Sequence, residues 1–124
     1  MKSKKKRWNP FRPLARFFVT LWATRTWEQA VRRADERHEK EKVMIYVASQ
    51  TFRPDVLTTY DKWRFKVEKS VYGYHARTLS LQTLKNGCYY HTPDRAGNQA
   101  MSKEEIERRK RFFIRERLEK ARLV

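Results

Sequence analysis

The fold of this chain is decided by residues 43–60, VMIYVASQTFRPDVLTTY. The run from Val43 to Ala48 is apolar and partly β-branched, which is typical of a buried strand. A turn signal surrounds Pro54, and residues 56–60 then have the composition of a second strand. We therefore predict a strand pair within residues 43–60, which begins a small sheet.

Helix signals flank this strand pair on both sides. Residues 26–29, TWEQ, have the form of a capping box, and the apolar residues after them recur with helical spacing. This pattern predicts a helix over 27–41. Residues 102–105, SKEE, form a second capping box and predict a long basic helix over 103–121.

One short strand and one ambiguous stretch lie between the strand pair and the second helix. Residues 88–92, CYYHT, read as a third strand. Residues 61–74 fit both periodicities, since their aromatic and aliphatic residues alternate in part and also recur with helical spacing. The helical template matches more positions, so we favour a helix over 62–70 and keep a strand as the alternative.

These elements predict an α+β fold. We expect one small domain over residues 14–124, with a short three-stranded sheet packed by helices. A hydrophobic fraction of 40%, with 14% aromatic residues, suffices for a small core. The 124 residues are too few for a barrel enzyme of about 250 residues. The single cysteine, Cys88, excludes a disulfide within these residues.

Positive charge is concentrated at the start of the chain. The 30 Lys and Arg exceed the 14 Asp and Glu by 16, and eight of the basic residues lie in residues 1–25, which hold no acid. We interpret residues 1–13 as a basic flexible arm, because Pro10 and Pro13 favour extended chain. A net charge of +16 indicates a polyanionic partner.

The apolar residues of segment 14–23 recur with helical spacing and predict an N-terminal amphipathic helix. We expect it to pack on the body of the protein or on a partner. The segment is too short to span a membrane, which makes a membrane partner less favoured, although contact with a membrane surface stays open. A secretory signal is disfavoured, because Arg16 interrupts the apolar run and no A-x-A cleavage site follows Ala23.

The residues that could carry catalysis form no recognisable site. The three histidines lack metal-ligand spacing, and Cys88 with His91 is at most half of a zinc site, so we predict no metal and no cofactor. A small metal-independent ribonuclease stays open as an alternative, because it needs only a basic cleft and an acid–base pair. Its candidate residues are His75, Arg77, Tyr90, His91 and Arg95.

The favoured function is non-enzymatic, sequence-independent binding of nucleic acid. Phosphates attract Lys and Arg, and aromatic side chains stack on unpaired bases. The predicted contacts are Lys4, Lys5, Lys6, Arg7, Trp8, Arg12, Arg16, Arg108, Arg109, Arg111 and Arg115. A structural or assembly protein is the alternative, with Phe17, Phe18 and Trp22 docking on a protein partner. We expect the bacterial or infected-cell cytoplasm, or a virion, as its location.

Two stretches carry a resemblance to a known group of proteins. One runs from Trp27-Glu28-Gln29-Ala30 through residues 34–38, ADERH, to Ile45-Tyr46-Val47, and the other is Tyr90-His91-Thr92-Pro93 before the charged helix. They resemble small proteins of Bacteroidales bacteria and of their crAss-like phages and mobile elements. The resemblance covers about residues 27–121 and leaves out the basic arm. It implies an accessory protein of a phage or mobile element, and it assigns no role to any residue.

Overall fold

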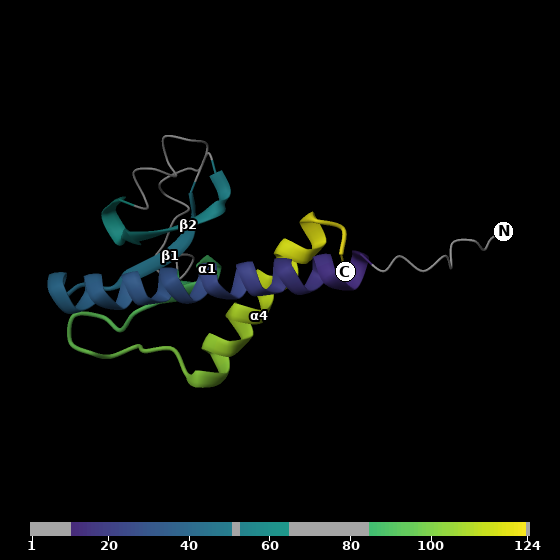
Figure 1. Ribbon diagram of the computed structural model, residues 1–124. Coiled ribbons are helices and arrows are strands. Elements are labelled where there is room, and N and C mark those ends of the chain that lie inside the picture. The colour runs from purple at the N-terminus through teal and green to yellow at the C-terminus, as the bar shows by residue number, and fades with distance from the viewer. Residues whose placement is uncertain (1–10, 51–52, 65–84, 124) are drawn as a thin grey trace.

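The computed structural model describes residues 11–50, 53–64 and 85–123, without the side chains of Pro54 and Asp55 (Figure 1). The chain has the predicted α+β fold, with a small sheet and a long C-terminal helix. Its principal elements are α1 (Phe11–Glu41), β1 (Ile45–Gln50), β2 (Arg53–Asp61), β3 (Tyr90–His91) and α4 (Lys103–Lys120). Residues 62–64 are helical, and the remainder of the predicted helix 62–70 lies outside the described residues.

The sheet is antiparallel, with the strand order β2-β1-β3. Tyr46 in the central strand stands opposite Tyr60 on one side and His91 on the other. A bulge between Ser49 and Gln50 shifts the register where β1 passes into β2. The strand pair within residues 43–60 is thus confirmed, and the third strand is confirmed at its centre.

The prediction of two N-terminal helices, 14–23 and 27–41, is wrong. A single helix of 31 residues, α1, runs from Phe11 to Glu41, so residues 11–13 of the predicted arm are helical too. Pro13 is tolerated because the N–H groups of a first helical turn have no partner within the helix. Thr26 does not cap a helix start, because α1 continues through it. Ala23 before it and Trp27 after it both face the core.

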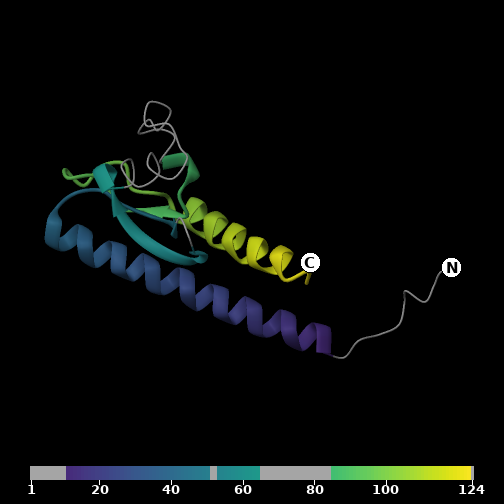
Figure 2. The same ribbon diagram turned by 90° about the horizontal axis from the view of Figure 1, so that it is seen from above.

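One side of α1 forms the wall of the core. Ala23, Trp27, Ala30 and Ala34 are buried there at helical spacing. Three of the four are alanines, whose small side chains let the sheet and α4 approach closely. Figure 2 shows the sheet against the C-terminal half of α1, while α4 runs beside the N-terminal half in roughly the opposite direction. The sheet and α4 contribute Ile45, Val47, Leu57, Tyr90 and Phe113 to the same core.

Helix α4 begins at the predicted capping box. The Ser102 hydroxyl accepts a hydrogen bond from the backbone N–H of Glu105, 3.1 Å away. The helix ends at Lys120, one residue before the predicted end. None of the described helices is long and apolar enough to cross a membrane.

Candidate nucleic-acid interface

A groove of about 600 Å³ lies along α4 where the N-terminal half of α1 approaches it. Of the residues that the structure describes, four arginines and three apolar residues line it, and no acidic residue does. The lining residues are Arg16, Arg108, Arg111, Phe112, Ile114, Arg115 and Leu118. We call this feature the basic groove.

Helical spacing brings three of the four arginines together. Arg108, Arg111 and Arg115 stand at positions i, i+3 and i+7 of α4, so their side chains share one face of the helix. Between them, Phe112 is an exposed aromatic ring at the groove. An exposed ring beside a row of cations is the combination that binds unpaired bases and their phosphates.

The fourth arginine enters from α1 and is held by the end of α4. Arg16 donates a hydrogen bond to the carbonyl of Leu123, at 2.5 Å, and Arg12 donates to the carbonyl of Arg122, at 3.2 Å. These carbonyls follow the last turn of α4, where peptide oxygens lack partners within the helix. The two cations also complement the negative end of the helix dipole. The same contacts fix Arg16 beside the groove.

The groove arginines are available to an external anion. Arg108 pairs with Glu105 at 2.6 Å, and Arg115 pairs with Glu119 at 3.1 Å. The two arginine side chains remain 71% and 72% exposed, and exposed ion pairs of this kind contribute only about 0–1 kcal/mol. Within the described ranges, Arg111 makes neither a hydrogen bond nor an ion pair. A phosphate group can therefore approach all three at little cost.

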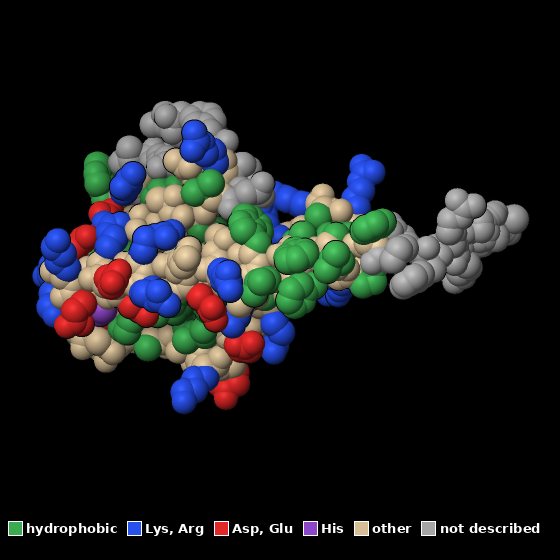
Figure 3. All heavy atoms as spheres, in the orientation of Figure 1, with side chains coloured by type: hydrophobic (Ala, Val, Ile, Leu, Met, Phe, Trp, Pro, Cys, Tyr) green, Lys and Arg blue, Asp and Glu red, His purple; other side chains and the backbone are tan. Residues whose placement is uncertain are grey.

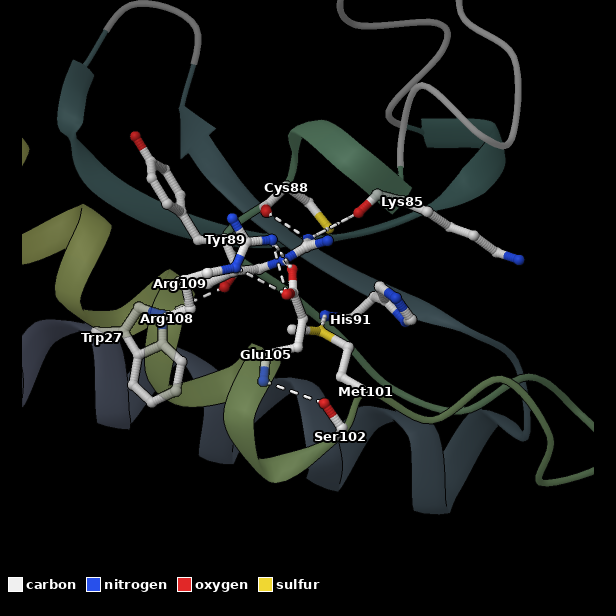
Figure 4. Close-up of polar contacts among 10 residues, drawn as sticks. All are labelled: Trp27, Lys85, Cys88, Tyr89, His91, Met101, Ser102, Glu105, Arg108 and Arg109. Atoms are coloured by element: carbon white, nitrogen blue, oxygen red, sulfur yellow. Dashed lines mark hydrogen bonds and ion pairs between the residues drawn. The ribbon is translucent and has the colours of Figure 1, made fainter.

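Arg109 points the other way, into the protein (Figure 4). Its side chain is only 14% exposed and pairs with Glu105 at 2.7 Å. Its Nη1 also donates to the carbonyls of Lys85 and Cys88, at 2.7 and 2.8 Å. Hydrogen bonds from Arg108 and Arg109 hold the pKa of the Glu105 carboxyl below its usual value. Arg109 joins α4 to the segment before β3, so we leave it out of the interface.

The structure thus brings together four of the predicted contacts, Arg16, Arg108, Arg111 and Arg115. Arg12 lies on the same side of α1 but reaches the end of α4 and does not line the groove. The predicted contacts Lys4 to Trp8 lie outside the described residues. Sequence reasoning missed Phe112, although its position four residues after Arg108 was a signal that it shares the arginine face.

The chain matches no known family model, no curated protein and no solved structure. The resemblance to proteins of Bacteroidales and their phages therefore stays a prediction. The case for the interface rests on the charge and geometry of the described residues.

The candidate ribonuclease residues take up core positions where they are described. Tyr90 and His91 are neighbours on β3, so their side chains lie on opposite faces of the sheet. The Tyr90 hydroxyl donates to Asp35 at 2.7 Å, and His91 packs near Tyr46, with its Nδ1 2.9 Å from the Thr92 carbonyl. Burial lowers the pKa of His91. Of the other candidates, Arg95 is exposed, and His75 and Arg77 lie outside the described residues.

Cys88 is buried beside Arg109 and the carbonyl of Lys85 (Figure 4). Among the described residues, no group of three His, Cys, Asp or Glu side chains is arranged to hold a metal ion. Cys88 forms a buried cluster with Tyr46, against which Met44 packs.

The Cys88 thiol gives a direct test of this packing. Burial raises its pKa to about 11, so at pH 8 only about one thiol in a thousand is ionised in the folded protein. We expect a thiol reagent at pH 8 to modify the native protein about a hundredfold more slowly than the urea-unfolded protein. The native rate should rise with pH up to about 11. Equal rates in both states would contradict the burial of Cys88.

Proposed function

We propose that this protein binds nucleic acid without catalysing a reaction, and that the basic groove holds the phosphate backbone. The observation that carries the proposal is the gathering of four arginines around one groove, with no acidic side chain among its described lining residues. The basic residues at 2–7 extend the same positive charge, in a chain whose formal net charge is +16. Both features favour a polyanion over a neutral ligand.

The chemistry of the groove favours backbone contacts over the reading of bases. A guanidinium group binds a phosphate through two parallel hydrogen bonds, which fixes position but carries no sequence information. Phe112 adds a surface on which an unpaired base of any kind can stack. We therefore propose sequence-independent binding, with single strands favoured over duplex.

Neutralising the groove tests the proposal. The triple variant Arg108→Gln, Arg111→Gln and Arg115→Gln removes three phosphate contacts. We expect the slope of log affinity against log salt concentration to fall by about 2–3, since each contact contributes about 0.7–0.9. Fluorescence anisotropy with a labelled oligonucleotide of random sequence measures this slope.

A control variant with the same change in net charge separates the groove from the overall charge. Arg32→Gln, Lys40→Gln and Lys103→Gln neutralise three exposed side chains that do not line the groove. This control is expected to keep nearly the slope of the parent. If both triple variants lose affinity and slope equally, the groove is not the binding site.

The cytoplasm is the proposed compartment, and an accessory role for a phage or mobile element is proposed from the resemblance alone. The ribonuclease alternative receives no support from the described residues, because Tyr90 and His91 face opposite sides of the sheet.

A further inference from the structure

The N-terminal half of α1 has an exposed apolar side. Phe11, Leu14, Phe17, Phe18 and Trp22 are each between 46% and 72% exposed, and we call these five residues the apolar face. Figure 3 shows hydrophobic side chains gathered over this half of the helix, whereas charged side chains cover the other half. A cluster of this kind on a protein surface marks a site of interaction.

The described part of the body packs on the side of α1 opposite the apolar face. The buried residues Ala23 and Trp27 show which side of α1 meets the sheet and α4. Arg12 and Arg16 also point to that side, since both reach the end of α4. We had expected the apolar stripe to pack on the body or on a partner, and the structure turns it away from the body.

The segment of sequence that carries the apolar face holds charge of one sign only. Residues 1–27 hold eight Lys and Arg and no Asp or Glu, and five of the cations lie at positions 2–7. The first acidic residue is Glu28, after which the exposed side of α1 carries both signs. Apolar surface and an excess of positive charge therefore coincide in the same segment.

We propose that the apolar face docks in the plane of an anionic lipid membrane. Helices that lie in the membrane interface bury Phe, Leu and Trp in the region between headgroups and acyl chains. Lasting attachment needs a second signal, and a run of four to eight Lys or Arg beside the helix supplies it by attracting anionic headgroups. The five basic residues at 2–7 match this second signal.

Charge favours a lipid surface over a second copy of the chain. A second copy presents the same excess of positive charge, whereas an anionic bilayer presents the opposite charge over a broad surface. The basic groove meets α1 on the side of Arg16, away from the apolar face. Membrane docking therefore leaves the groove open, and this inference does not depend on the proposed function.

Binding of the full chain to vesicles tests the inference. We expect sedimentation with vesicles that contain phosphatidylglycerol, little sedimentation with phosphatidylcholine alone, and weaker binding as salt screens the headgroups. Phe18→Asp should weaken binding by about tenfold or more, because it places a charge in the apolar face. Gln29→Asp introduces the same charge on the exposed side of the same helix, beyond the apolar face, and should change binding by less than about twofold.

Three outcomes would overturn the inference. The first is the absence of binding to anionic vesicles, and the second is an equal loss of vesicle binding in the Phe18→Asp and Gln29→Asp variants. The third is a parent protein that does not bind vesicles but forms a dimer in sedimentation equilibrium, which Phe18→Asp dissociates. Circular dichroism of both variants checks that α1 remains folded. Phe18→Asp is expected to match Gln29→Asp in oligonucleotide affinity, so the failure of either proposal can be recognised separately.

Discussion

Replacing Arg109 with alanine is expected to lower the free energy of unfolding by about 3 kcal/mol. The side chain is 14% exposed and bridges three partners, the Glu105 carboxylate and the carbonyls of Lys85 and Cys88. Without it, these groups lose a charged donor at a partly buried site. Urea unfolding followed by far-ultraviolet circular dichroism measures the loss.

The neighbouring arginine provides the control. Arg108→Ala removes a cation of the same kind that also binds Glu105, but its side chain is 71% exposed. We expect this variant to lose less than about 1 kcal/mol, as is usual for exposed ion pairs. Similar losses in the two variants would mean that Arg109 does not join α4 to the segment before β3.

Replacing Trp27 with alanine is expected to cost about 3–5 kcal/mol, the range for deleting a buried aromatic side chain. Trp27 is 4% exposed and contacts β3, the residue just before β3, and α4. Its ring meets Tyr90 edge-on at 6.2 Å, and its Nε1 donates to the Tyr89 carbonyl. Lys110 from α4 lies over the same ring, 5.8 Å from its centre. Alanine would therefore leave a cavity and remove contacts that hold α1 to both the sheet and α4.

The same substitution at Trp22 serves as the control for this prediction. Trp22 lies five residues earlier in α1 but is 46% exposed on the apolar face. Trp22→Ala should change the free energy of unfolding by about 0.5 kcal/mol or less, as is typical of surface positions. Chemical unfolding of both variants compares the two losses directly. A large loss at Trp22 would show that the apolar face is packed in the folded protein.

The elements with local signals were predictable from the sequence. The strand pair follows from an apolar run, a turn and a second run, and α4 follows from a capping box whose Ser102 is a true cap. Residues 26–29, TWEQ, predicted a helix start that does not exist, because a capping box is a local pattern and takes no account of the residues before it. Residues 11–25 have helical spacing of their own, and the core formed by Ala23 and Trp27 spans the supposed boundary.

The candidate interface was predictable only in part. The cluster of basic residues in α4 is visible in the sequence, and helical spacing separates Arg109 from Arg111 once the core-facing side is known. The sequence does not reveal that side, because the charged residue Arg117 is buried there, with its guanidinium carbon 5.1 Å from the centre of the Phe113 ring. The approach of Arg16 to α4 depends on a contact across 107 residues, for which no local signal exists.

The length of α1 has a consequence for the order of folding. Its C-terminal half bonds to β2 across 22 to 24 residues, through Arg33 and Arg37, and to β3 across 55 residues, through Asp35. Its N-terminal half meets the end of α4 through Arg12 and Arg16, in contacts that span 107 to 110 residues. Closing the larger loops costs more chain entropy, so the first half of the helix should dock late and detach early. We therefore expect the two ends of this continuous helix to belong to different cooperative units, with the end that carries the apolar face opening while the sheet stays intact.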